Sequence, residues 1–132
     1  MINWKLKLKK QDLEYFLFQF CTINEVKYIF AIYMNKILFN CEGFEWDEGN
    51  SEKSRIRHNV MQGECEQVFF NEPIMVFSDE KHSQEESRLY LLGKTDSERF
   101  LFVVFIIRNN RIRIISARDM NKKERGVYNE QA

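Results

Sequence analysis

Four arginines lie close together near the C-terminal end of the sequence, and their type and spacing suggest chemistry. They are Arg108, Arg111, Arg113 and Arg118. A guanidinium group presents a planar fork of N–H donors that matches the oxygens of a phosphate group. Arginines clustered on a rigid strand would therefore form a surface for phosphate. The alternative is a solvated sheet edge, and the arginines taken alone favour that simpler interpretation.

The element that must position these arginines is a β-hairpin centred on Asn109-Asn110. Two consecutive Asn residues tolerate positive φ in a tight turn, and the runs 101–107 and 111–119 are typical of strands. A two-residue loop fixes the register, which places guanidinium groups on one face and core residues on the other. The predicted pairs across the strands are Arg108 and Arg111, Ile106 and Arg113, Ile107 and Ile112, and Phe105 and Ile114.

Length and composition predict one domain with an ordinary core, since the chain has 132 residues and 44% of them are hydrophobic. The net charge is zero but unevenly distributed. Residues 44–98 hold thirteen acidic and six basic side chains, a net charge of −7, whereas residues 99–130 hold eight basic and three acidic ones, a net charge of +5. With this uneven charge, the basic C-terminal part suits an anionic partner, and the acidic middle part suits a protein with a basic segment.

The three cysteines, Cys21, Cys41 and Cys65, are odd in number, widely spaced and have no histidine nearby. This pattern indicates neither a disulfide framework nor a zinc site, and it favours the reducing cytoplasm.

Residues 1–41 differ in composition from the rest of the chain. They contain no Gly or Pro, and 23 of the 41 are Phe, Ile, Lys, Asn or Tyr, all encoded by AT-rich codons. Polar residues interrupt the apolar stretch from Tyr15 to Leu38, so it fits a membrane span poorly, and no signal-peptide cleavage site follows its first part. We expect an over-extended reading frame with the true start at Met34, followed by a domain at 42–132. The alternative is a genuine additional helix, or a helix and a strand.

The middle of the chain predicts a strand, two helices and two further strands. Residues 44–47 alternate as a half-buried strand does, and Asp47 or Ser51 can cap a helix that ends at His58, where Asn59 takes the left-handed conformation. A second helix is expected over 63–70, with Cys65, Val68 and Phe69 facing inward. Strands follow at 74–77 and 88–93, the latter with Leu89 and Leu91 on one side.

The remaining connections complete the predicted fold class. Residues 78–86 form a charged loop, 94–98 a turn, and the sequence from Asn121 to Glu124 is a capping box that begins a helix over 122–129. The order of elements predicts an α+β fold: an antiparallel sheet with two N-terminal helices and a C-terminal helix.

Five motifs follow one another along the chain. They are Phe44-Glu45-Trp46-Asp47, the helix end from Lys53 to Val60, Asp79 with His82-Ser83 and Arg88, the strand from Arg113 to Arg118, and the segment from Glu124 to Tyr128. In this order they resemble the BrnT family of toxins from type II toxin–antitoxin systems. The resemblance covers Phe44 to about Glu130. Asn59 departs from the glycine usual in the family, which affects only the helix end. Members of the family begin just before the first motif, which agrees with a start at Met34.

The resemblance implies a RelE-like fold and a metal-independent endoribonuclease that needs no cofactor and inhibits translation. It also implies a BrnA-type antitoxin that neutralises the toxin and binds operator DNA through its own ribbon-helix-helix domain.

A metal-free ribonuclease must remove the proton of the 2′-hydroxyl, protonate the leaving 5′-oxygen and stabilise the charged phosphorus. For phosphate stabilisation we predict Arg113 and Arg118, assisted by Arg88. For proton transfer we predict His58 and His82, the two imidazoles of the chain, with Lys53 in reserve. The predicted RNA-binding residues are Lys53, Arg108, Arg111 and Tyr128.

Structural explanations exist for several of these residues. His58 would also cap a helix C-terminus, His82 would be an oriented or solvated loop residue, the arginines would pair with carboxylates, and Trp46 would belong to the core.

Other reaction classes are less well supported. Ser116 lacks a nucleophile elbow, no glycine-rich phosphate loop exists, and the histidines and carboxylates have no metal-ligand spacing. The principal alternative is a non-catalytic module that binds an antitoxin and takes part in transcriptional autorepression.

Overall fold

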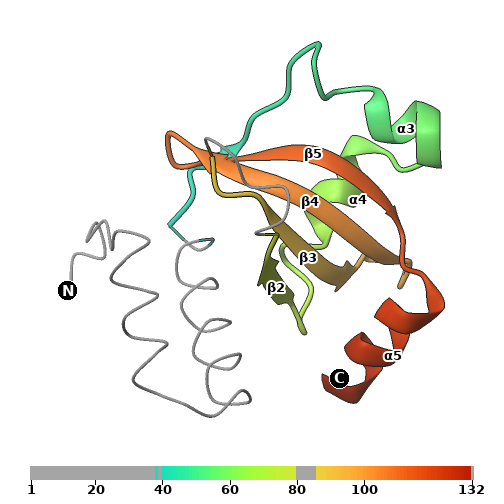
Figure 1. The fold of residues 1–132 in the computed structure, drawn as a ribbon. Helices are drawn as coiled ribbons and strands as arrows, with labels where there is room; N and C mark the ends of the chain where they lie inside the picture. Colours follow the sequence, from blue (N-terminus) through green and yellow to red (C-terminus); the bar gives the residue numbers. More distant parts are fainter. Residues whose placement is uncertain (1–37, 39, 80–85, 132) are drawn as a thin grey trace, which may run out of the picture.

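A five-stranded β-sheet organises the part of the chain that the computed structural model describes, namely residue 38, residues 40–79 and residues 86–131 (Figure 1). The strand order is β1-β5-β4-β3-β2. The described elements, in chain order, are β1 (Gly43–Phe44), α3 (Lys53–His58), α4 (Gln62–Gln67), β2 (Met75–Ser78), β3 (Leu89–Lys94), β4 (Phe100–Arg108), β5 (Arg111–Asp119) and α5 (Lys122–Gln131). The predicted α+β class is confirmed. His82 and Met34 lie outside the described residues.

The central hairpin has the register predicted from its turn. Asn109 and Asn110 have φ values of 53° and 59°, so both adopt the left-handed conformation that a two-residue turn requires. The predicted pairs are confirmed, including Arg108 with Arg111 and Ile106 with Arg113. A β-bulge at Val104/Phe105 interrupts the ladder further along and shifts the pairing by one residue.

The prediction of a purely antiparallel sheet is wrong at one edge. β1 is parallel to β5, with Gly43 paired to Arg111 and Phe44 to Ile112, so the sheet is mixed. The strand is only two residues long, shorter than predicted. Two parallel strands need a long crossover connection, and here it consists of α3, α4 and three strands.

The helix boundaries differ from the predictions in small ways. α3 begins at Lys53 with Glu52 at its N-cap and no side-chain capping bond, while the Asp47 carboxylate accepts the N–H of Gly49 at 2.8 Å instead. Asn59 ends this helix in the predicted left-handed conformation, with φ 53°. α4 ends at Gln67 and continues into a turn. The capping box of α5 is confirmed: the Asn121 N–H donates to Glu124 at 2.9 Å and the Glu124 N–H donates to Asn121 at 2.8 Å.

The outer edge of β5 is completed by side chains where β1 stops. The N–H of Glu45 donates to the Ile112 carbonyl at 2.8 Å. Beyond it, the Asn50 side-chain amide donates to the carbonyl of Ile114 at 2.9 Å, and the Ser54 hydroxyl accepts the N–H of Ala117 at 2.8 Å. Asn50 and Ser54 are both buried. These bonds satisfy backbone groups that an unpaired edge would expose, and they hold α3 against the sheet.

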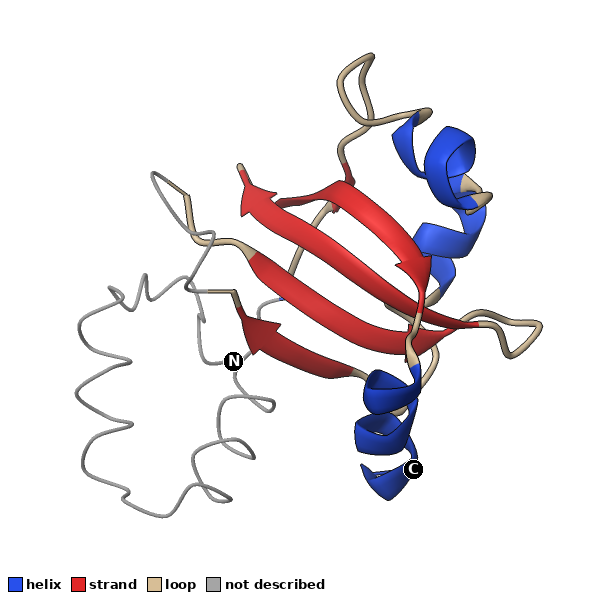
Figure 2. Ribbon diagram, turned by 45° about the vertical axis from the view of Figure 1, so that its right-hand side comes forward, coloured by secondary structure: helices blue, strands red, loops and turns tan. Residues whose placement is uncertain are grey.

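The two faces of the sheet carry two separate hydrophobic clusters. One face, covered by α4 and the turn that follows it, forms the larger core, which contains the predicted inward residues of the second helix and of β3 (Figure 2). They are Cys65, Val68, Phe69, Leu89 and Leu91. The opposite face packs one end against α5. Along β5 the side chains therefore alternate between the larger core and the α5 side of the sheet.

We predict that Asn50→Ala lowers the free energy of unfolding by about 2 to 3 kcal/mol, because a buried carbonyl on β5 loses its donor. Asn50 also accepts the N–H of Asp47 at 2.8 Å and donates to the Glu45 carbonyl at 3.0 Å, so the loop loses three bonds in all. Urea denaturation followed by circular dichroism measures the change. The matched control is Asn129→Ala on the exposed side of α5, and an equal effect of both substitutions would contradict the edge role of Asn50.

Candidate functional site

The sheet face that packs against α5 carries arginines from β4, from β5 and from the segment just before β3. Residues paired across β4 and β5 share this face, and Arg88, which precedes β3, reaches it because the neighbouring Leu89 points into the larger core. We call this surface the arginine face. Its arginines are Arg88, Arg108, Arg111, Arg113 and Arg118.

Arg113 is bound to two carboxylates. Its Nη1 lies 2.7 Å from Asp47 Oδ2 and 3.1 Å from Glu45 Oε1, and its Nη2 lies 2.9 Å from Asp47 Oδ1. The hydrogen bond from Arg113 is the main reason that the pKa of Asp47 is lowered. The Arg113 side chain is 14% exposed, whereas that of Asp47 is 53% exposed. The guanidinium fork is therefore aligned as for a phosphate, but a solvent-exposed carboxylate occupies it.

Arg118 is bound to a carboxylate of α5. Its Nη1 and Nη2 donate to the two carboxylate oxygens of Glu124 at 2.8 and 3.0 Å, and Nη1 also donates to the Asp119 carbonyl at 3.1 Å. Burial opposes ionisation of Glu124, but the hydrogen bonds from Arg118 and from the Asn121 N–H lower its pKa overall. The same carboxylate thus holds Arg118 and begins α5.

Arg113 and Arg118 lie at well-separated positions of β5 and do not act on one phosphate together. Their partners on β4 are Ile106 and Phe102, which are four positions apart. At the rise of a β-strand this places the two attachment points about 13 Å apart. The two guanidinium groups turn toward different carboxylates, one after β1 and one on α5. The structure therefore does not bring them together around one phosphate.

At the hairpin end of the arginine face, carboxylates also form ion pairs with an arginine. Arg108 lies 3.0 Å from Glu86 and 3.7 Å from Glu45. Arg111 is exposed beside it. Arg88 is anchored through its backbone, since its carbonyl accepts the N–H of Asp79 at 2.8 Å.

The predicted proton-transfer residues lie apart from these arginines. His58 is the last residue of α3 and is exposed, and its positive charge contributes to the lowered pKa of Asp119, whose largest cause is the hydrogen bond from Arg99. Because Asp119 follows Arg118 on the strand, the two side chains point to opposite sides of β5. His58 is thus on the helix side of the sheet edge. Lys53 is half-buried at the start of the same helix.

Arg99 was not singled out by the sequence, yet it connects four segments. It donates to Asp119 at 2.7 and 3.1 Å, to the Asn59 carbonyl at 2.9 Å and to Glu64 at 3.2 Å. Its pKa is raised chiefly by the hydrogen bond with Asp119. Arg99 satisfies the end of α3 and ties it to α4 and β5, which is a structural role. No local motif signals it, because the acceptor on Asn59 is 40 positions away.

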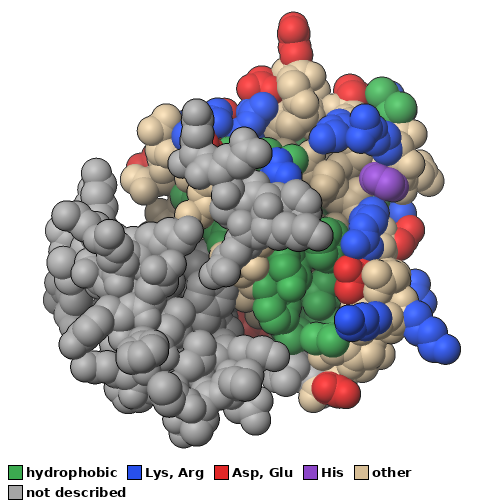
Figure 3. Space-filling view, in the orientation of Figure 1, with side chains coloured by type: hydrophobic (Ala, Val, Ile, Leu, Met, Phe, Trp, Pro, Cys, Tyr) green, Lys and Arg blue, Asp and Glu red, His purple; other side chains and the backbone are tan. Residues whose placement is uncertain are grey.

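A row of flat side chains crosses the arginine face. Phe77 stacks on Tyr90 with ring centroids 4.9 Å apart, Tyr90 stacks on Phe102 at 5.1 Å, and the guanidinium carbon of Arg118 lies 4.1 Å from the Phe102 centroid. Hydrophobic side chains gather beside α5 in the space-filling view, next to basic and acidic groups (Figure 3). The row was missed by the sequence analysis, although the alternation along each strand is a signal that places these aromatics on one face.

Tyr128, predicted to bind RNA, and Trp46, interpreted as a core residue, both have structural partners. Tyr128 is 1% exposed, and its hydroxyl donates to the Pro73 carbonyl at 2.8 Å. Its ring belongs to the smaller hydrophobic cluster, which leaves no open face for a nucleotide. Trp46 packs against the larger core and donates from Nε1 to Glu66 at 2.9 Å, as its structural interpretation predicted.

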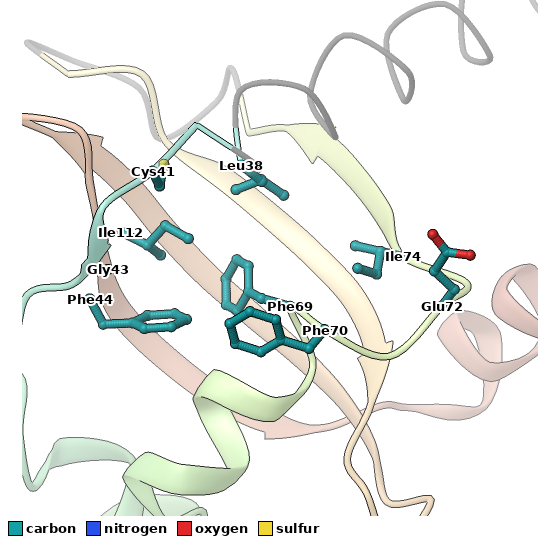
Figure 4. Close-up of a pocket in the computed structure, with 9 residues that line it drawn as sticks. All are labelled: Leu38, Cys41, Gly43, Phe44, Phe69, Phe70, Glu72, Ile74 and Ile112. Carbon is teal, nitrogen blue, oxygen red and sulfur yellow. The ribbon is translucent and has the colours of Figure 1, made fainter.

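A separate apolar hollow of 470 Å³ opens on the side of the sheet opposite the arginine face (Figure 4). Phe44, Phe69 and Phe70 form one wall, with Ile112 beside them. Among the described residues that line it, Glu72 is the acidic one. Leu38, the first residue that the structure describes, also lines the hollow.

Neither a metal centre nor a reactive thiol is apparent at Cys65. Within residues 40–79 and 86–131, no group of three or more potential ligand side chains is placed to hold a metal ion. Burial raises the pKa of the Cys65 thiol to about 12, so this cysteine is a core residue. No helix among the described residues has the length and apolar character needed to cross a membrane.

Comparison with models of known protein families gives a match. The model of a family described as "Ribonuclease toxin, BrnT, of type II toxin-antitoxin system" matches residues 46–124, which is more than half of the chain. Among curated proteins, no sequence matches this chain. The matched segment contains every strand except β1 and reaches the carboxylate that binds Arg118.

The Glu124 ion pair predicts a dependence of stability on pH. Because folding lowers the pKa of Glu124, its contribution is fully present above the ordinary carboxyl value of about 4.3 and is lost as the pH falls through the lowered value of the folded state. We expect Glu124→Gln to reduce the free energy of unfolding by about 1 kcal/mol near neutral pH, and the difference from wild type to be smaller at a second pH well below about 4.3.

Urea denaturation of both proteins at the two pH values measures this difference. Glu48→Gln, which changes an exposed carboxyl in the loop before α3, is the control and should have little effect at either pH. A deficit of Glu124→Gln that stayed the same at low pH would show that the carboxylate charge is not what stabilises this end of the sheet.

Proposed function

Because the chain belongs to the BrnT family of ribonuclease toxins, we propose that it cleaves RNA without a metal ion and thereby inhibits translation. A type II toxin is paired with a protein antitoxin, and we propose that the partner is of the BrnA type and that operator DNA is bound only through it. The observation that carries this proposal is the family match over residues 46–124.

The arginine face is the proposed site of RNA binding. It combines five arginines with half-buried aromatic rings on rigid strands, which are the two components that single-stranded RNA requires. Arg113 is the proposed phosphate ligand. The Asp47 side chain is 53% exposed and belongs to a loop, so a phosphate can approach it and displace it from the fork of Arg113. Arg88, Arg108 and Arg111 would then guide the RNA backbone on either side.

Cleavage also requires transfer of two protons, and His58 and His82 are the proposed donor and acceptor. His58 is exposed at the end of α3, beside the edge of the sheet, so an RNA strand that passes over this edge can approach it. Lys53, on the same helix, is the reserve candidate for the base. The positive charge on Arg113 supplies the electrostatic stabilisation that a metal ion would otherwise provide.

A second candidate function is supported by a specific feature. Carboxylates occupy the forks of both Arg113 and Arg118, which is also what a purely structural role for these arginines requires. On that interpretation the protein is a non-catalytic module that binds its antitoxin and takes part in autorepression.

Induction of the protein in cells, alone and together with the product of the neighbouring gene as the proposed antitoxin, distinguishes these two functions. We expect growth arrest and breakage of total RNA for the protein alone, and relief of both by the antitoxin. Normal growth with soluble, folded protein would contradict the ribonuclease function and favour the binding module.

Substitutions at Arg113 and Asp47 test the phosphate site directly. We expect Arg113→Ala to slow RNA cleavage about 100-fold, as for loss of a donor to the transition state. Arg113→Lys should also be impaired, because it keeps the charge but loses the bidentate fork. Asp47→Asn should preserve or increase cleavage, because it weakens the competitor for Arg113. Arg55→Ala on α3, which removes one partner of a surface ion pair with Glu52, is the control. An Arg113→Lys variant as active as wild type would exclude the bidentate role.

A further inference from the structure

The guanidinium group of Arg118 is the last member of the stacked row on the arginine face. Phe77, Tyr90 and Phe102 come from β2, β3 and β4, and Arg118 continues the row onto β5. Among the described strands, β1 is the one beyond β5, and it pairs with β5 at Arg111 and Ile112, far from Arg118. Phe102 therefore covers one face of the guanidinium plane, and no described strand covers the other.

The edges of the guanidinium plane are already occupied. Nη1 and Nη2 bind the two oxygens of Glu124, and Nη1 also binds the Asp119 carbonyl. The Glu124 side chain is only 17% exposed, and its Oε1 also accepts the Asn121 N–H at the start of α5. A phosphate could replace Glu124 only by breaking the cap of a helix. This situation differs from that of Arg113, whose main partner Asp47 is an exposed loop residue.

From this arrangement we infer that Arg118 binds an unpaired RNA base by stacking on its outer face, and does not bind a phosphate. The inference rests on the proposed ribonuclease function and changes the role predicted for Arg118. A guanidinium plane is a known surface for stacking of unpaired bases, and it attracts the π-face of the base. The ion pair with Glu124 fixes the plane and neutralises its charge, while the side chain remains 36% exposed.

Stacking and phosphate binding differ in their dependence on salt. Each phosphate contact to a single strand adds about 0.7 to the slope of log K against log salt concentration, whereas stacking releases no counterions and contributes nothing to that slope. Stacking also needs the base itself. A strand that contains abasic sites keeps the phosphates and removes only the stacking partner.

The experiment measures binding of the full chain to a fluorescent 2′-O-methyl RNA strand of mixed sequence, which cannot be cleaved, over a series of salt concentrations. A strand of the same length with abasic sites is measured in parallel. We expect Arg118→Ala to weaken binding to the intact strand about tenfold, to leave the salt slope unchanged, and to leave the abasic strand unaffected. Arg113→Ala, the matched control, should reduce the slope by about 0.7 on both strands.

Arg118→Lys keeps the inference testable if the alanine variant does not fold. Lysine keeps the charge but lacks the plane, so a stacking role predicts a loss close to that of alanine, with the slope again unchanged. A reduced slope, or an equal loss on the abasic strand, would overturn the inference while leaving the ribonuclease function intact. Failure of the wild-type protein to bind either strand would overturn the RNA-binding proposal and this inference together.

Discussion

The outer edge of β5 is the constraint on which the arrangement of this domain depends. A β-strand with one unpaired edge must satisfy its N–H and C=O groups in some other way. Here a two-residue strand, the Asn50 amide and the Ser54 hydroxyl share that task in sequence along the edge. The same bonds fix the loop that carries Glu45 and Asp47, and they place α3 beside β5. The position of the carboxylates around Arg113 is thus a consequence of how the edge is closed.

The arginines of the sheet form two kinds of ion pair that differ in how easily they can be exchanged. Arg113 meets an exposed loop carboxylate, whose replacement by another anion leaves the rest of the fold in place. Arg118 and Arg99 meet carboxylates that also satisfy a helix terminus or join several elements. Removing such a partner would leave helix-end backbone groups unsatisfied. A shared residue type therefore does not imply a shared role, and the second partner of each carboxylate decides which arginine is available to a ligand.

The two faces of the sheet have different chemistry because α4 and the turn after it cover one of them, while α5 covers only an end of the other. The covered face holds the larger core. The other face keeps half-buried aromatic rings beside charged groups, an arrangement that suits flat, anionic ligands such as single-stranded nucleic acid. His58 is separated from the arginine face, because its helix follows the edge of β5 and does not lie over the strands.

The sequence by itself determined the features that depend on neighbouring residues. The left-handed pair Asn109-Asn110 set the hairpin register, Asn59 ended α3, and the reciprocal bonds of Asn121 and Glu124 began α5. The order of motifs also identified the family. Tertiary structure alone decided the partners of the arginines, the parallel pairing of β1, the role of Arg99 and the stacked aromatic row. The physical reason is range: turns and caps are closed within a few residues, whereas Asp47 meets Arg113 across 66 positions. Which of the many carboxylates meets a given guanidinium is set only when the edge of β5 and the helices have packed.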